Sequence, residues 1–165
     1  MAAVISDCGR YRYRLERDLA MFGRIAAVIM VNPSTADALQ DDATIRRVIG
    51  FGQRLGWSRV IVGNVFAYRA TDIRLLSGIV DPVGPENAAH LRRICEDADL
   101  AVVAWGRLGK LPRKLQDGWR MVETIASDLG MMLHCLGTAA DGHPRHPLML
   151  SYGAALIEWR APLAQ

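Results

Sequence analysis

Residues 25–31 read IAAVIMV, an unbroken apolar run that decides the predicted fold. A run of this length without a polar residue is typical of a strand buried on both faces of a sheet. Three further, largely apolar runs of strand length follow in the chain: residues 59–63 (RVIVG), 99–104 (DLAVVA) and 131–136 (MMLHCL). Together the four runs predict the centre of a sheet.

Helix signals separate these strands. Apolar spacing and a start at Asp42 predict a helix over residues 42–55, which Gly56 would end. Further helices are expected over residues 72–79, 86–97 and 112–129. Alternating strands and helices imply a mostly parallel sheet with helices on both faces. We therefore expect an α/β protein with three layers, α/β/α, and about four core strands.

The two ends of the chain add smaller elements. Residues 10–17 (RYRYRLER) alternate in character, which predicts an N-terminal edge strand with one solvent-facing side. Residues 151–165 are expected to form a short C-terminal element. The length of 165 residues and the 51% hydrophobic fraction suit a single domain over residues 1–165, with its α/β core at residues 25–150.

Composition limits the class of protein. No apolar run approaches the roughly 18 residues of a membrane span, and the N-terminus lacks a secretory pattern, so we expect no membrane partner and a cytoplasmic location. Cys8, Cys95 and Cys135 are too scattered for a disulfide framework and too few for a four-thiolate iron–sulfur cluster. No cofactor is expected, and the sequence leaves the oligomeric state open.

The arginines are unevenly distributed. Nine of them fall in the first 60 residues: Arg10, Arg12, Arg14, Arg17, Arg24, Arg46, Arg47, Arg54 and Arg59. Two interpretations are open, a basic face that attracts phosphate groups and an ordinary solvated surface.

Ligands of parallel α/β sheets bind at the carboxyl ends of the strands, so the loops after the four strands form the candidate site. The first loop contains Asn32-Pro33-Ser34, in which Pro33 restricts the backbone and aims Asn32 at a ligand or a water. A plain turn is the alternative. Asp37, Asp41 and Asp42 follow, and such carboxylates activate water or hold a cation. We expect Asp42 to cap the helix and keep Asp41 as the catalytic candidate.

The second loop offers groups for a ring-shaped, anionic ligand. Asn64 has the donors and the acceptor that read the edge of a base. Phe66 and Tyr68 would stack on a ring, and Arg69 would meet a phosphate. Each aromatic residue is also compatible with a place in the core.

The third and fourth loops complete the set. Trp105-Gly106 ends the third strand, where Gly106 allows close backbone approach and a helix at residues 107–115 would present its N-terminus to an anion. The fourth loop, His143-Pro144-Arg145-His146-Pro147, is rigid and titratable. Either histidine can act as acid or base or donate to a developing negative charge. No neighbouring Cys or Glu completes a metal site.

The order of these motifs resembles that of the uracil-DNA glycosylase superfamily, over roughly residues 25–150. Members carry an Asp- or Asn-Pro pair after the first strand, a base-reading Asn after a later strand, a strand ending in Trp-Gly, and a loop that begins His-Pro. The corresponding positions are Asn32-Pro33, Asn64, Trp105-Gly106, and either His143-Pro144 or His146-Pro147.

A second resemblance covers nearly the whole chain. The strings NPSTADALQDDATIRR, NVFAYRATD and DGHPRHPL are similar to those of a bacterial and phage family known as domain of unknown function 1643. The name of that family supplies no activity.

The glycosylase resemblance implies roles for four residues. Asn32 would position the water that attacks the sugar, and Asn64 would read a base taken out of its stack. His143 or His146 would stabilise the charge on the departing base. Asn32 stands where the fastest members have a carboxylate, which leaves water activation weaker or assigns it to an aspartate of the same loop.

Three functions are therefore compatible with the sequence. The first is a glycosylase-like hydrolase that cleaves an N-glycosidic bond of a damaged or modified base. The second is a non-catalytic module of the same fold that binds nucleic acid or a nucleotide, with Arg145 and Arg69 among its contacts. The third is a metal-assisted hydrolase that uses Asp37, Asp41, His143 and His146.

Overall fold

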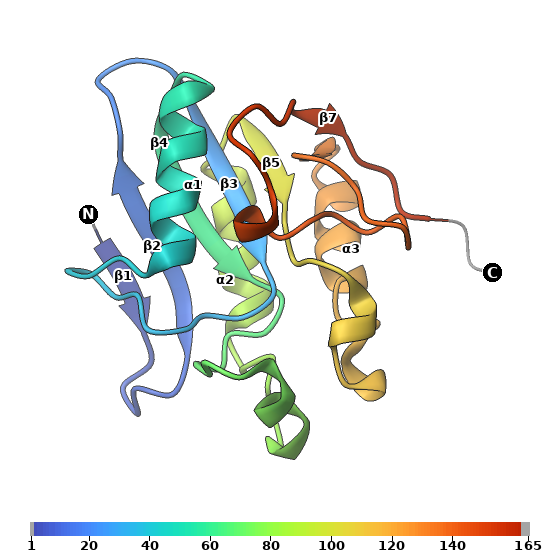
Figure 1. Cartoon of the computed structure of the whole chain (residues 1–165). Helices are drawn as coiled ribbons and strands as arrows, with labels where there is room; N and C mark the ends of the chain where they lie inside the picture. Colours follow the sequence, from blue (N-terminus) through green and yellow to red (C-terminus); the bar gives the residue numbers. More distant parts are fainter. Residues whose placement is uncertain (1, 163–165) are drawn as a thin grey trace.

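The computed structural model describes residues 2–162. Within this range one mixed sheet of seven strands has the order β1-β2-β4-β3-β5-β6-β7 (Figure 1). Its strands are β1 (Ala2–Ile5), β2 (Arg12–Asp18), β3 (Arg24–Met30), β4 (Trp57–Asn64), β5 (Leu100–Val103), β6 (Leu133–Cys135) and β7 (Ile157–Glu158). The α-helices are α1 (Ala43–Arg54), α2 (Asn87–Glu96) and α3 (Arg120–Asp128). Short 3₁₀ helices are η1 (Ile73–Gly78), η2 (Leu108–Lys110), η3 (Arg113–Leu115) and η4 (Pro147–Met149).

The four predicted core strands are confirmed, and they run parallel to one another. β3 pairs with β4 on one side and with β5 on the other, and β5 pairs with β6. The prediction of a mostly parallel sheet is wrong, because β1–β2, β2–β4 and β6–β7 are antiparallel pairs. The N-terminal strands β1 and β2 and the C-terminal strand β7 give the parallel centre antiparallel margins.

β2 is not the edge strand that its alternating sequence predicted. It lies between β4 and β1, and β1 forms the edge. Arg12 and Arg17 of β2 are each only 2% exposed, because residues 36–41 of the loop after β3 lie over them and accept their hydrogen bonds. The alternation of a strand shows which residues share a face, but not what covers that face.

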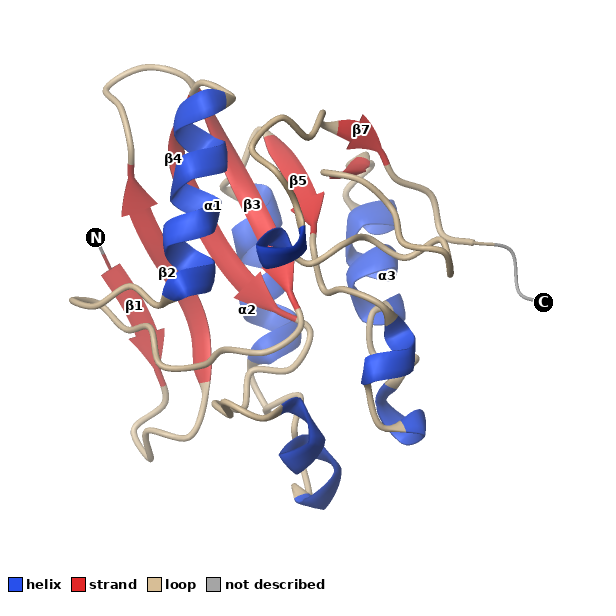
Figure 2. Cartoon of the chain, in the orientation of Figure 1, coloured by secondary structure: helices blue, strands red, loops and turns tan. Residues whose placement is uncertain are grey.

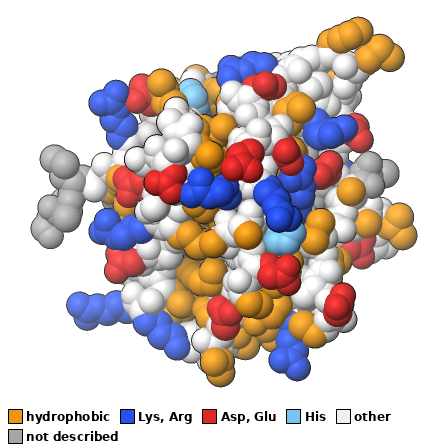
Figure 3. Space-filling model, turned by 180° about the vertical axis from the view of Figure 1, so that it is seen from behind, with side chains coloured by type: hydrophobic (Ala, Val, Ile, Leu, Met, Phe, Trp, Pro, Cys, Tyr) orange, Lys and Arg blue, Asp and Glu red, His pale blue; other side chains and the backbone are white. Residues whose placement is uncertain are grey.

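The residues of β3 account for the layers. Ala27 and Ile29 belong to the core under α2 and α3, whereas Val28 and Met30 belong to the core under α1. Figure 2 shows α1 on the near face of the sheet and α2 on the far face. Seen from behind (Figure 3), hydrophobic side chains gather toward the end of the molecule at which the parallel strands finish.

Local sequence accounts for the start of α1 and for the late start of α3. The Asp42 side chain accepts from the Ile45 N–H at 2.9 Å, which confirms the predicted N-cap. The predicted helices over 107–115 and 112–129 are replaced by η2 and η3, and α3 begins only at Arg120. Pro112 interrupts the helix pattern, and Gly118 turns the chain against the Phe66 ring.

The segment that begins with η4 crosses the outer side of α1, and residues 147–156 are called the strap. Leu150 packs on Phe51, and the Tyr152 ring lies over Gly50 of α1. The Arg47 guanidinium lies 3.9 Å from the centre of the Tyr152 ring and donates to the Leu150 carbonyl. The strap thereby attaches the His-Pro loop to α1. No helix within residues 2–162 combines the length and the apolar character needed to span a membrane.

Candidate ligand-binding and active site

A cavity of about 580 Å³ lies beyond the carboxyl ends of β3 and β5, between the loops that follow them, η1 and η4. Most of its lining is apolar: Val31, Ile73, Trp105, Gly106, Ala139, Ala140, Leu148 and Met149. Arg107, Lys110, Arg145 and His146 complete it. We call it the apolar cavity. Its volume is that of a typical small-molecule site, and its lining suits a flat ring with charged groups at the rim.

A smaller cavity of about 190 Å³ adjoins the apolar cavity, and Val31 and His146 line both. Its polar lining comes from β2, the loop after β3, the start of α1 and the loop after β4: Arg12, Asn32, Ser34, Asp42, Thr44 and Thr71. We call it the polar cavity. Met30, Val31, Ile45 and Ala70 also line it, but its hydroxyl-binding groups suit a sugar better than an apolar ring.

A third, more open depression of about 720 Å³ follows, and Ser34, Ala70 and Thr71 line both it and the polar cavity. We call it the open cleft. Its other lining residues include Arg10, Thr35, Tyr68, Arg69, Leu75 and Ile79. The three spaces therefore follow one another along the strand-end edge of the sheet.

His146 stands at the junction of the first two cavities. Its Nδ1 accepts from the Leu148 N–H at 3.4 Å, which leaves the neutral ring with its proton on Nε2. Burial lowers the pKa of His146, and the nearby Lys110 ammonium lowers it further, against the opposing effect of Asp42. At neutral pH His146 is thus a neutral imidazole whose free nitrogen is a hydrogen-bond donor.

Asp42 and Asn32 line the polar cavity beside His146. Oδ1 of Asp42 caps α1, and the charge of the carboxylate is close enough to act on both His146 and Arg12. The amide nitrogen of Asn32 donates to the carbonyls of Pro33, at 3.0 Å, and Ala70, at 2.7 Å. Both amide protons are therefore used, and the Asn32 oxygen is the atom left to accept from a ligand or a water.

His143, the other predicted histidine, lies in an aromatic cluster of the core. It is 4% exposed and lines none of the three spaces described above. Its Nδ1 faces the Trp105 indole N–H at 3.4 Å, and the Trp119 ring centre is 5.1 Å away. Burial lowers the pKa of His143, with Asp141 opposing. The structure thus separates two histidines that the sequence could not rank.

Asn64 and Phe66 are also in the interior. Asn64 is 1% exposed, and its Oδ1 accepts from the Arg12 guanidinium at 3.2 Å. Phe66 is 1% exposed and packs in the core under α2 and α3. At this point of the sheet the residue that lines a cavity is therefore Arg12 and not Asn64.

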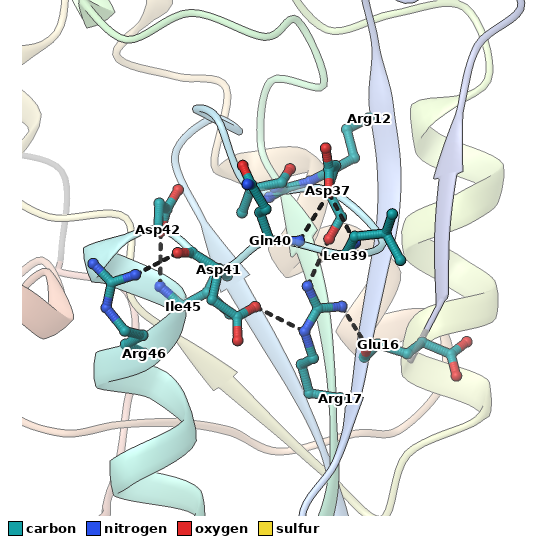
Figure 4. A network of polar contacts seen from close by, with 11 residues as sticks. Arg12, Glu16, Arg17, Asp37, Leu39, Gln40, Asp41, Asp42, Ile45 and Arg46 are labelled. Atoms are coloured by element: carbon teal, nitrogen blue, oxygen red, sulfur yellow. Dashed lines mark hydrogen bonds and ion pairs between the residues drawn. The ribbon is translucent and has the colours of Figure 1, made fainter.

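The aspartates of the first loop have separate partners (Figure 4). Asp41 accepts from the Arg17 Nε at 2.8 Å, and Asp37 accepts from the backbone N–H groups of Leu39 and Gln40. Within residues 2–162, no group of three or more His, Cys, Asp or Glu side chains is placed to hold a metal ion. The four side chains of the metal-assisted alternative are not brought to a common point.

The remaining predicted residues lie at the cavities. Trp105, Gly106 and Arg145 line the apolar cavity, Ser34 lines the polar cavity and the open cleft, and Tyr68 and Arg69 line the open cleft. Pro33 is buried and accepts hydrogen bonds from Asn32 and Ala70. Sequence reasoning missed Arg12, Thr44, Arg107 and Lys110 as lining residues. The crossing of β2 behind the first loop, which places Arg12 there, has no local signal.

The family model described as protein of unknown function DUF1643 matches residues 12–148. The chain belongs to this family. The matched region of this DUF1643 protein runs from the start of β2 into η4 and so includes Asn32, Asp42 and His146. No curated protein and no solved structure gives a significant match, so the resemblance to uracil-DNA glycosylases stays a prediction from motifs.

The cations around the cavities of this DUF1643 protein share one property. Within residues 2–162 none of them forms an ion pair with a carboxylate: Arg10, Arg12, Arg69, Arg107, Lys110 and Arg145. The buried Arg12 donates to the Ala36 carbonyl at 2.8 Å and to Asn64, and burial lowers its pKa to about 10. Cations whose donors are not taken up by a carboxylate are available to an anionic ligand.

Proposed function

We propose that this protein hydrolyses the N-glycosidic bond of a nucleotide, with the base in the apolar cavity and the sugar in the polar cavity. One observation carries the proposal: Asp42 and His146 line the same polar cavity, and His146 also lines the apolar cavity. A ligand that spans the two spaces has the bond between its ring and its sugar at His146.

The lining residues support this placement of the ligand. The apolar walls of the larger cavity exclude water from a ring, and its cationic rim suits a polar, electron-rich base. The polar cavity offers hydroxyls of Ser34 and Thr44 and the Arg12 guanidinium to sugar oxygens. A free amino acid or an aliphatic acid would leave one of the two spaces unused.

The proposed reaction is a displacement by water at the sugar carbon. Asn32 accepts a hydrogen bond from the attacking water, and the Asp42 carboxylate takes a proton from it. The carbon–nitrogen bond breaks, and its electron pair leaves with the base. His146 donates its Nε2 proton in a hydrogen bond to the charge that develops on the base, which then takes up a proton from solvent.

The test is a release assay. Wild-type protein is incubated with mononucleotides and short oligonucleotides that carry uracil, damaged bases or phage-type modified bases, and free base is measured by chromatography and mass spectrometry. We expect release from one member of the panel. His146→Asn keeps an acceptor for the Leu148 N–H but has no Nε2 proton, and it should lower the rate by about 10²- to 10⁴-fold.

Asp42→Asn is a matched variant, because Asn is as good an N-cap as Asp and keeps α1 intact while removing the charge. It should lower the rate by a similar factor. Asp128→Asn and His90→Asn, at positions outside the three spaces, are the controls and should stay within about twofold of wild type. Unchanged rates in both Asp42→Asn and His146→Asn would contradict the mechanism. Tight binding of panel members without any release of base would show that the protein is a binding module rather than an enzyme.

A further inference from the structure

The proposed reaction uses two of the three spaces at the strand ends and leaves the open cleft without a role. Two cations line this cleft, Arg10 and Arg69, and neither forms an ion pair with a carboxylate within residues 2–162. They lie beside each other, because the backbone N–H of Arg69 donates to the Arg10 carbonyl at 2.9 Å. No Asp or Glu is among the lining residues of the cleft. The cleft is therefore a positively charged surface of the described chain.

The neutral groups of the cleft also favour a phosphate ligand. Within residues 2–162 the hydroxyls of Ser34, Thr35 and Thr71 make no hydrogen bond to protein, although all three line the cleft. Hydroxyls and guanidinium groups together are typical contacts of a phosphate backbone. Tyr68 is half-buried in the wall of the cleft and adds an aromatic ring on which a base can stack.

The position of the cleft connects it to the proposed site. Ser34, Ala70 and Thr71 separate it from the polar cavity and line both, so a group in the cleft is one step along the edge from the sugar. The volume of about 720 Å³ exceeds what one phosphate group needs. It is comparable with that of the apolar cavity, which has room for a base.

We propose that the open cleft binds the phosphodiester and the neighbouring nucleotide of a nucleic-acid strand, so that the substrate is a strand rather than a free nucleotide. The inference rests on the proposed function for the place of the reacting nucleotide. Arg10 and Arg69 contact the phosphodiester, the three hydroxyls complete its shell, and Tyr68 stacks on the adjacent base.

Binding of two probes tests this inference: a fluorescein-labelled single-stranded DNA 11-mer of mixed sequence with one deoxyuridine, and deoxyuridine monophosphate. In the double variant Arg10→Gln/Arg69→Gln, 11-mer affinity should fall at least 10-fold, and the slope of log affinity against log salt should decrease by about two. Tyr68→Leu should also weaken the 11-mer about 5-fold or more by loss of stacking. Neither variant should change monophosphate affinity by more than about twofold. An RNA 11-mer shows whether the cleft distinguishes the two sugars.

The control is Arg92→Gln/Arg120→Gln, which removes the same charge from two arginines that are paired with Asp128 and Asp117 away from the cleft. It should bind the 11-mer like wild type. Equal 11-mer affinities of the cleft variants and the wild type would overturn the inference. It would also be overturned if the double variant lost affinity for both probes by the same factor while Tyr68→Leu had no effect, because the cleft would then hold the ligand's own phosphate. Cleft-dependent binding without base release would leave this inference standing and remove the proposed reaction.

Discussion

Arg12 and Arg17 lie on the same strand, are both 2% exposed, and are covered by the same loop, yet their surroundings differ. Arg17 forms an ion pair with Asp41 at 2.8 Å and donates to two backbone carbonyls (Figure 4). Arg12 has no carboxylate partner within residues 2–162, and its Nε lacks any partner. The first arginine holds the loop in place, whereas the second places a guanidinium with no hydrogen-bonded carboxylate beside a cavity.

The same difference recurs elsewhere in the chain. Several arginines remote from the strand ends are paired with carboxylates, as Arg14 is with Asp97 and Arg92 is with Asp128. Figure 3, which shows the molecule from behind, has basic and acidic side chains next to one another across that face. Within residues 2–162 the cations around the three cavities have no such partners. The guanidinium and ammonium groups at the cavities are therefore available to a ligand.

The largest expected effect concerns Arg17, the arginine that pairs with Asp41. Arg17→Met should lower the free energy of unfolding by about 3 kcal/mol, because it leaves Asp41 and two carbonyls without their donor. Urea unfolding followed by circular dichroism measures this. A loss below about 1 kcal/mol would mean that the ion pair does not hold the loop.

A smaller effect is expected for the unpaired member. Arg12→Met removes a desolvated charge together with its hydrogen bonds to Ala36 and Asn64, so the unfolding free energy should fall by only about 1–2 kcal/mol. The comparison fails if this variant is less stable than Arg17→Met in the same urea titration. Nucleotide binding should weaken in Arg12→Met, because Arg12 lines the polar cavity.

The strap offers a test of how the cavity side is supported. A Cβ at Gly50 would overlap the Tyr152 ring, so Gly50→Ala should destabilise the protein by about 1–2 kcal/mol despite the better helix propensity of Ala. In a Tyr152→Ala background the same change should be stabilising, by up to about 1 kcal/mol. Thermal unfolding of the four proteins of this cycle measures the coupling. Additive effects would show that the ring does not lie on Gly50 in solution.

The smallest effect concerns pH and the two histidines. The pKa of His143 and the pKa of His146 are lowered in the folded protein, chiefly by burial, so the unfolded chain binds more protons near pH 6. The stability that they contribute is complete above the unfolded pKa of about 6.5 and is lost as the pH falls below it. His143→Gln should flatten the decline in unfolding free energy between pH 7.5 and 5.5. An unchanged slope would contradict the neutral, buried state of this ring.

Sequence reasoning located most of the fold because its signals are local. The apolar run at residues 25–31, the cap at Asp42 and the turn at Gly56 each depend on neighbours within one element, and the structure has β3, α1 and its end there. It misjudged β2 because the covering loop comes from residues 36–41, far along the chain from residues 12–17. Apolar spacing predicts one helix over 112–129, but Pro112 and Gly118 interrupt it, and α3 begins only at Arg120.

The candidate site also has a part that the sequence predicts and a part that it does not. The sequence named the four loops and many of their residues, including Asn32, His146 and Arg69, because Pro, Gly and His stand out in an apolar chain. It ranked Asp41 over Asp42, yet Asp41 pairs with Arg17 while Asp42 both caps α1 and lines the polar cavity. The sequence shows that Asp42 can cap α1, but it does not show that the same side chain also lines a cavity.

The sequence by itself determined the parallel centre of the sheet, the helices on its two faces and the loops at the strand ends. The spacing of hydrophobic residues and the turn residues between them encode these features within short stretches of the chain. Only the tertiary structure decided which of two histidines meets a cavity, and which arginines keep a free charge. Such outcomes depend on contacts between β2, the first loop, α1 and the strap, and no short stretch of sequence contains those distances.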